Sequence, residues 1–158
     1  MSGPMRFGLI GVGKMGRHHA RVINEIDSAS LVVVCDQNKV NAKEVSEKYD
    51  VSFCTNIVDM LKYKLDAVVI ATPTVTHESI AETLLKKQIH CLIEKPLALD
   101  TNSSINISKY ALESGAFLQV GHVVRYDPVI RAIRGLNLDP CLSHKHIQNL
   151  HQKVLSSL

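Results

Sequence analysis

Three glycines at GxGxxG spacing close an apolar run in the stretch Arg6-Phe7-Gly8-Leu9-Ile10-Gly11-Val12-Gly13-Lys14-Met15-Gly16. Residues 6–10 predict a short strand, and residues 14–26 predict a helix because apolar side chains recur there at helical spacing. In this context the first glycine permits a tight turn, the second lets main chain approach a pyrophosphate, and the third lets helix pack on strand. The helix N-terminus adds free N–H groups and a partial positive charge. We therefore predict that dinucleotide phosphates contact Gly11, Val12, Gly13, Lys14, Met15 and Gly16.

An acidic residue stands where a dinucleotide site needs one. The second predicted strand, 31–35, ends at Asp36, which lies 20 residues after Gly16 (36 − 16). A carboxylate at this place accepts hydrogen bonds from the adenosine ribose and repels a 2′-phosphate. Gln37 follows it, and no arginine does, so NAD(H) is favoured, while Lys39 keeps NADP(H) open as the second choice. The alternative reading of Asp36 is a helix-capping residue without a ligand.

Strands and helices alternate through the first 121 residues. Strands are expected over 6–10, 31–35, 51–54, 67–71, 90–94 and 117–120, with helices over 14–26, 39–49, 57–61, 76–87 and 101–114. Asn38, Asn56 and Thr76 are the expected helix caps. This pattern predicts the α/β class, with a doubly wound parallel sheet, the Rossmann fold.

The alternation is lost after residue 126. Residues 127–134 predict one more helix, and the apolar spacing between 147 and 158 predicts a terminal amphipathic helix. We therefore expect an NAD-binding domain over 5–134 and an atypical tail over 135–158.

Two further segments leave strands at the carboxyl edge, where open α/β sheets bind ligands. Ala71-Thr72-Pro73 predicts a rigid turn, and His77 after it either touches ribose or nicotinamide or serves the start of a helix. Lys95 follows the fifth strand within Glu94-Lys95-Pro96. A lysine there either binds a substrate hydroxyl and takes part in proton transfer or is an exposed turn residue.

These motifs, in this order, resemble the glucose-fructose oxidoreductase / inositol dehydrogenase / rhizopine catabolism family (Gfo/Idh/MocA). The motifs that carry the resemblance are Gly11–Gly16 with Arg17-His18-His19-Ala20, Ala71-Thr72-Pro73 with His77, Glu94-Lys95-Pro96, and Gly121-His122 with Arg125-Tyr126-Asp127-Pro128. The resemblance covers about residues 5–134. Within the family, the chain resembles the UDP-N-acetylglucosamine 3-dehydrogenase-like members.

The resemblance implies cofactor contacts for the glycine turn, Asp36, Thr72, Pro73, Glu94, Gly121 and His122. The further candidate cofactor contacts are Gln37, Ala71, His77 and Lys95. Lys95 would be the catalytic lysine that contacts the reacting hydroxyl, and Pro96 would be preceded by a cis peptide bond. The implied reaction passes hydride between the nicotinamide and a ring carbon of a sugar, nucleotide sugar or cyclitol.

Members of this family normally continue into a C-terminal α+β substrate domain. The resemblance does not extend to that domain, so we expect it to be missing from this chain. We therefore expect a cofactor-binding half with little turnover alone, and its exposed apolar surface would favour homo-oligomer formation. The alternative is a dinucleotide-binding or interaction module without catalysis.

Composition narrows the remaining function classes. Net charge is +3, from 18 basic and 15 acidic residues that form no long run, so we expect no nucleic-acid partner. No apolar stretch reaches the length of a membrane span and no secretory signal is visible, so we expect a cytoplasmic protein without a membrane partner. We also predict no metal site, because no Cys or carboxylate cluster joins the C-terminal histidines His144, His146 and His151. For His18 and His19 the sequence shows no acid–base partner.

Overall fold

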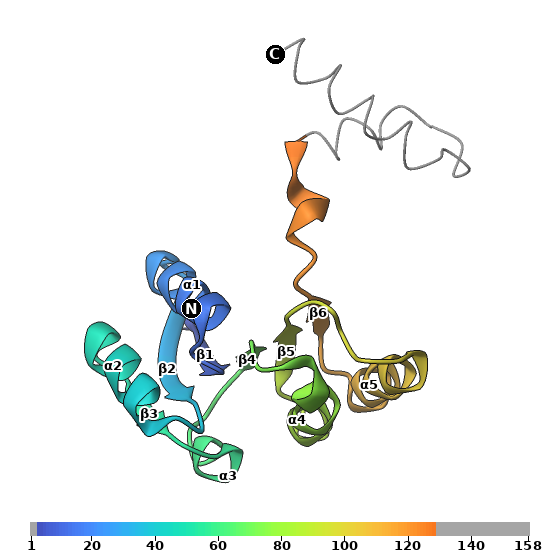
Figure 1. Cartoon of the computed structure of the whole chain (residues 1–158), viewed down its shortest axis with the longest axis horizontal. Coiled ribbons are helices and arrows are strands. Elements are labelled where there is room, and N and C mark those ends of the chain that lie inside the picture. Colours follow the sequence, from blue (N-terminus) through green and yellow to red (C-terminus); the bar gives the residue numbers. More distant parts are fainter. Residues whose placement is uncertain (1–2, 129–158) are drawn as a thin grey trace. The chain divides into compact units, whose positions relative to one another are not determined.

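A six-stranded parallel sheet forms the centre of residues 1–121 (Figure 1), in a computed structural model that describes residues 3–128. The strands are β1 (Met5–Ile10), β2 (Ala29–Cys35), β3 (Ser52–Cys54), β4 (Ala67–Ile70), β5 (His90–Ile93) and β6 (Leu118–Val120). Their order is β3-β2-β1-β4-β5-β6, and all neighbours pair in parallel. The predicted doubly wound Rossmann sheet is thus confirmed, and its order reverses between β1 and β4.

Helices cover both faces of the sheet. They are α1 (Lys14–Glu25), α2 (Lys39–Tyr49), α3 (Ile57–Met60), α4 (His77–Leu85) and α5 (Thr101–Ser114), with a 3-10 turn, η1 (Thr74–Thr76), before α4. One apolar core holds α1 and α2 side chains such as Ile23 and Val45. The other holds Met60, Leu84 and Ile107 from α3, α4 and α5. The apolar strand β4 is buried along its whole length, as its sequence predicts.

Most predicted helix ends agree with the structure. The Asn38 side chain accepts hydrogen bonds from two N–H groups at the start of α2, and the Asn56 side chain accepts one from the N–H of Asp59 in α3. Gly115 ends α5 in the left-handed conformation, with φ of 71°. The cap expected from Thr76 is wrong: its hydroxyl bonds the carbonyl oxygen of Pro73 and no helix N–H of α4.

The chain divides into two units, residues 1–121 and 122–158, which we describe separately. In the second unit, Val123–Tyr126 form a 3-10 turn, η2. The predicted tail helix over 147–158 and most of the predicted helix over 127–134 lie outside the described residues.

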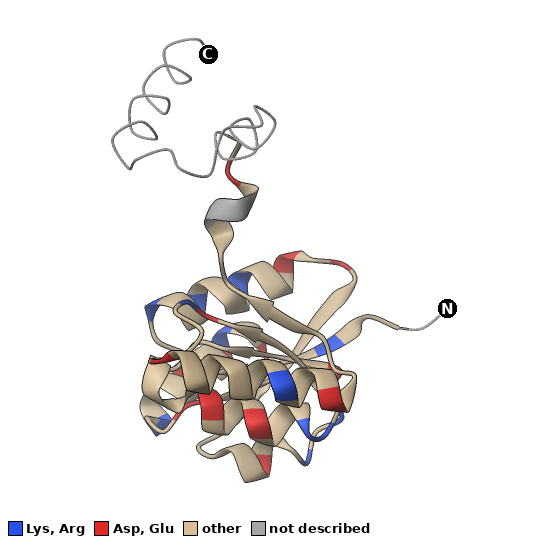
Figure 2. Cartoon of the chain, turned by 90° about the vertical axis from the view of Figure 1, so that its right-hand side faces the viewer, with Lys and Arg blue, Asp and Glu red and all other residues tan. Residues whose placement is uncertain are grey.

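Basic and acidic residues are interspersed along the helices (Figure 2). Within residues 3–128, no helix combines the length and the apolar character that crossing a membrane requires.

Candidate functional site

The three glycines of the turn between β1 and α1 have different surroundings. Gly11 has φ of +84°, and a Cβ there would lie 2.6 Å from the carbonyl oxygen of Ala71. A Cβ on Gly16 would collide with the carbonyl oxygen of Gly11. A Cβ on Gly13 would meet nothing within 4 Å. The first and third glycines therefore let elements pack closely, whereas the second faces open space that a ligand can enter.

The first turn of α1 offers free donors beside that space. Gly13 occupies the N-cap position, no side chain caps the helix, and no acidic residue stands in its first turn. The first N–H groups of a helix have no partner within it, and the helix dipole favours negative charge at this end. The turn therefore suits an anionic group such as a pyrophosphate.

Asp36 stands beside this turn at the end of β2. Its Oδ2 accepts a 2.8 Å hydrogen bond from the N–H of Val12, and its Oδ1 accepts one of 2.8 Å from Asn38. Each carboxylate oxygen can accept a second hydrogen bond, so the side chain remains able to bind hydroxyl groups. The Val12 N–H already donates to Asp36, and the Val12 side chain is fully buried. Val12 therefore supports the turn and orients Asp36.

A cleft of about 900 Å³ joins these groups at the carboxyl edge of the sheet. Nine predicted site residues line it: Gly11, Gly13, Lys14, Met15, Asp36, Gln37, Ala71, Thr72 and Pro73. Its other lining residues are Ile10, Cys35, Asn38, Thr55, Asn56, Ile57, Thr76 and Ile80. The sequence carried a signal for Thr55–Ile57, because they follow β3 at the edge where Asp36 follows β2. Val12, Gly16, His77, Glu94, Lys95 and Gly121 do not line the cleft.

The thiols near the sheet are poorly reactive. Burial, and then the neighbouring Cys54, raise the pKa of Cys35 from 9.0 to about 12. Burial alone raises the pKa of Cys91 to about 12. Both thiols therefore stay protonated near neutral pH, and Cys35 contributes only an apolar wall to the cleft.

His77 is 1% exposed and contacts main chain with both ring nitrogens. Its Nε2 lies 3.0 Å from the carbonyl oxygen of Thr72. Its Nδ1 lies 3.2 Å and 3.1 Å from the carbonyl oxygens of Pro96 and Leu97. Of the two readings of His77, this placement favours the structural one, because its ring joins the turn after β4 to the turn after β5.

Glu94 and Lys95 follow β5 directly and have different environments. Lys95 is exposed, and the Lys95–Pro96 peptide bond is cis, as expected. Glu94 is buried, and its Oε1 lies 2.7 Å from Nε2 of His19 on α1. Its Oε2 accepts a 3.1 Å hydrogen bond from the N–H of Lys95. The sequence shows no acid–base partner for His19, whereas the structure supplies Glu94, which is 75 residues away in sequence.

The last two predicted contacts fall on either side of the unit boundary. A Cβ on Gly121 would lie 3.2 Å from Oε1 of Glu94, so the main chain at this glycine packs closely against the buried carboxylate. His122 begins the second unit and is not placed relative to the cleft.

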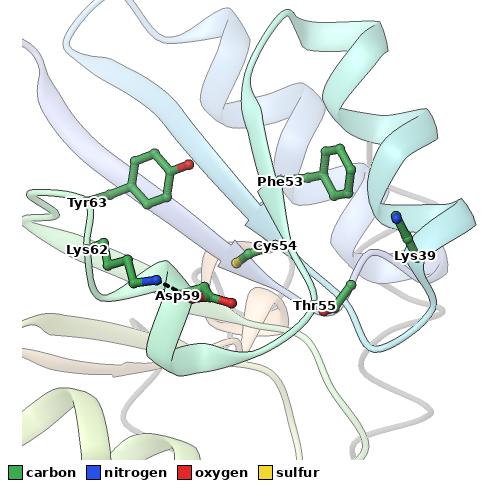
Figure 3. A pocket seen from close by; sticks show the side chains of 7 residues that line it. All are labelled: Lys39, Phe53, Cys54, Thr55, Asp59, Lys62 and Tyr63. Atoms are coloured by element: carbon green, nitrogen blue, oxygen red, sulfur yellow. Dashed lines mark hydrogen bonds and ion pairs between the residues drawn. The ribbon is translucent and has the colours of Figure 1, made fainter.

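A second hollow, of about 510 Å³, lies beside β3 (Figure 3). Its lining residues are Lys39, Phe53, Cys54, Thr55, Asp59, Lys62 and Tyr63. Lys62 is paired with Asp59, which lies 2.5 Å from its Nζ, and this pair occupies one wall of the hollow. Neither the glycine turn nor Lys95 reaches this hollow, so we assign the site to the larger cleft.

Sequence comparison agrees with this geometry. Residues 5–122 match the GFO_IDH_MocA family model, described as an oxidoreductase family with an NAD-binding Rossmann fold. The chain belongs to the Gfo/Idh/MocA family. The family expectation and its NAD-binding Rossmann domain are thereby confirmed.

Relatives of this Gfo/Idh/MocA chain include dehydrogenases of two substrate types. It is 40% identical over 130 residues to UDP-N-acetylglucosamine 3-dehydrogenase of Acidithiobacillus ferrooxidans, covering 82% of this chain and 41% of that protein. It is 35% identical over 132 residues to inositol 2-dehydrogenase of Rhizobium meliloti, covering 82% and 39%. The chain thus spans about 40% of the length of these curated relatives.

A solved structure that is similar to this chain carries a cofactor. The WlbA dehydrogenase of Bordetella pertussis, in complex with NADH and UDP-GlcNAcA, superposes on this Gfo/Idh/MocA chain with a TM-score of 0.81 at 27% identity. The match covers 85% of this chain and 40% of that one.

Proposed function

We propose that this chain binds NAD(H) in the large cleft and serves an oxidoreductase that acts on a sugar, nucleotide sugar or cyclitol hydroxyl. The observation that carries the proposal is that one cleft joins the open side of Gly13, the uncapped start of α1 and the Asp36 carboxylate. These groups suit two parts of one dinucleotide: the first two suit the pyrophosphate, and the third suits the adenosine ribose. We take residues 5–134 as the cofactor domain and 135–158 as a separate tail.

The order of the strands gives the cofactor its direction. Asp36 follows β2, and Glu94 and Lys95 follow β5, so they stand on opposite sides of the β1/β4 reversal. If Asp36 holds the adenosine ribose, the nicotinamide half extends toward β5. We therefore propose that Glu94, Gly121 and His122 serve that half, as the family resemblance implies, and that His77 acts through the turns it joins.

Lys95 is the proposed catalytic residue. With NAD bound, the nicotinamide supplies the hydride acceptor for oxidation of an alcohol. Lys95 Nζ would contact the reacting oxygen: as the amine it would accept the hydroxyl proton during oxidation, and as the ammonium it would return that proton during reduction. Its exposure at the end of β5 supports this role, because a substrate can approach it from outside the cofactor cleft.

Calorimetric titration of the purified chain with NADH, and separately with NADPH, tests cofactor binding. We expect saturable NADH binding and weaker NADPH binding. Absence of binding for both dinucleotides would refute the proposal.

Turnover is tested separately, by absorbance at 340 nm with NAD and a panel of cyclitols, sugars and nucleotide sugars. Lys95→Ala should leave the Kd for NADH within about twofold and lower any turnover by about 100-fold or more. Lys87→Ala, an exposed lysine at the far end of the preceding α/β unit, is the matched control. The same assay measures how much turnover the 158-residue chain has by itself. NADH binding without turnover on any substrate would favour the non-catalytic module.

A further inference from the structure

The Glu94 carboxylate is confined on several sides at the end of β5. Its side chain is 8% exposed, and a buried carboxylate is costly unless its oxygens find donors. Nε2 of His19 lies 2.7 Å from Oε1, and the N–H of Lys95 donates to Oε2. The close approach of Gly121 completes the enclosure. The Glu94 carboxylate therefore holds one orientation, and its hydrogen bond with the N–H of Lys95 fixes the main chain at Lys95.

His19 connects the Glu94 carboxylate to α1. The residue lies three positions after Gly16, on the helix whose first turn faces the cleft, and its side chain is 17% exposed. The His19–Glu94 contact thereby ties the helix that follows the glycine turn to the strand end that carries Lys95. Two parts of the site that are far apart in sequence are held at a fixed spacing.

We propose that His19 is a positioning residue, which acts through Glu94 to place the end of β5 for the nicotinamide half of the cofactor. The proposal rests on the proposed function, since it assumes that the dinucleotide runs from Asp36 toward β5. It assigns His19 no contact with substrate. It does predict that loss of the His19–Glu94 contact harms one half of the cofactor site and spares the other.

Two ligands separate the halves. NADH contains the nicotinamide, whereas ADP-ribose contains only the adenosine, pyrophosphate and ribose that the Gly13 and Asp36 side of the cleft would hold. For the native chain we expect both to bind, with NADH the tighter ligand. The informative quantity is therefore the ratio of the two Kd values, measured calorimetrically for each variant.

Two polar substitutions of His19 separate loss of the contact with Glu94 from loss of the imidazole ring itself. In His19→Gln the side-chain amide nitrogen can stand near the place of the imidazole Nε2, so the contact with Glu94 is kept. In His19→Asn the amide is too short to reach that carboxylate. We expect His19→Asn to weaken NADH binding about tenfold, the effect of losing one hydrogen bond to a charged group, with ADP-ribose affinity changed less than about twofold. His19→Gln should restore most of the NADH affinity.

His18→Asn is the matched control, because His18 is the exposed neighbour on the same helix. It should leave both affinities unchanged, and thermal melts of all variants report their folding. Equal losses for NADH and ADP-ribose in His19→Asn, or equal NADH affinities of the Gln and Asn variants, would overturn the positioning role. A variant that melts early but keeps the native ratio of Kd values would show a structural pair only, which also overturns it. Failure of the native chain to bind either ligand refutes the proposed function instead, and with it this inference.

Discussion

The N–H of Val12 donates a 2.8 Å hydrogen bond to Oδ2 of Asp36, joining the glycine turn after β1 to the end of β2. The N–H of Asn38 donates a 2.8 Å hydrogen bond to the other carboxylate oxygen, Oδ1. The carboxylate is thus oriented before any ligand arrives, and its negative charge stands at a fixed place in the cleft. A preorganised charge of this kind discriminates ligands without a cost of ordering when they bind.

Removal of that charge should change cofactor preference. Asp36→Asn keeps the shape of the side chain, while the repulsion of a 2′-phosphate is lost. We expect the NADPH/NADH ratio of Kd values to fall about tenfold, corresponding to about 1.4 kcal/mol. Calorimetric titration with both dinucleotides measures this ratio, and Asp27→Asn, at an exposed turn, is the control. An unchanged ratio would show that Asp36 does not set the preference.

Alanine at Gly13 and at Gly16 should have opposite consequences. At Gly13 the added methyl group enters open space, so unfolding free energy should change by less than about 1 kcal/mol, while NADH binding is blocked. At Gly16 the methyl group meets the Gly11 carbonyl oxygen, and the chain should lose about 1–3 kcal/mol of stability. Urea unfolding and NADH titration distinguish the two variants. Loss of stability in Gly13→Ala, with NADH binding intact, would contradict the assignment of its open side to a ligand.

His77→Leu should destabilise the fold, because the main-chain carbonyl groups that contact the His77 ring would lose their hydrogen-bond partner. The oxygens of Thr72, Pro96 and Leu97 would face an apolar side chain in place of a ring nitrogen. Leaving buried acceptors unpaired costs about 1–3 kcal/mol, which urea unfolding detects. His18→Leu, on the exposed side of α1, provides the comparison, and equal effects of both substitutions would rule out the linking role of His77.

Alkaline pH should weaken the fold through its buried thiols. The pKa of Cys91 is raised from 9.0 to about 12 by burial, so above pH 9 the unfolded chain loses a proton that the folded chain keeps. Its contribution is complete below pH 9 and is lost as pH rises toward 12, at up to about 1.4 kcal/mol per pH unit. Urea unfolding at a series of pH values measures the slope. Cys91→Ala should make that slope shallower, with Cys35 still contributing, and an unaltered slope would count against burial as the cause.

Local patterns sufficed to predict the order of strands and helices. The helix over residues 101–114 agrees with α5 at both ends, because Gly115 supplies a left-handed stop that few other residues tolerate. The glycine turn and Asp36 were predictable for the same reason, since each occupies a fixed place relative to a strand end. Differences at strand ends are one or two residues, as for the predicted 31–35 against the observed Ala29–Cys35.

Contacts between distant segments could not be predicted in this way. The 75 residues between His19 and Glu94 leave no periodic signal, and only the packing of α1 over the sheet brings them together. His77 followed a strand end, as ligand-binding residues do, yet its ring turns inward to main-chain oxygens. The direction of a side chain at the start of a helix depends on neighbours from another strand, which the local sequence does not contain.

The uncapped first turn of α1 has a consequence for how such a site can evolve. Its donors are main-chain N–H groups, which almost every amino acid supplies, so mutation cannot adjust their chemistry and can only obstruct the space before them. Heritable change in ligand preference must therefore arise at neighbouring side chains such as Asp36 and Gln37. The phosphate-binding part of the cleft can stay constant while descendants of one ancestral domain diverge in the nucleotides they accept.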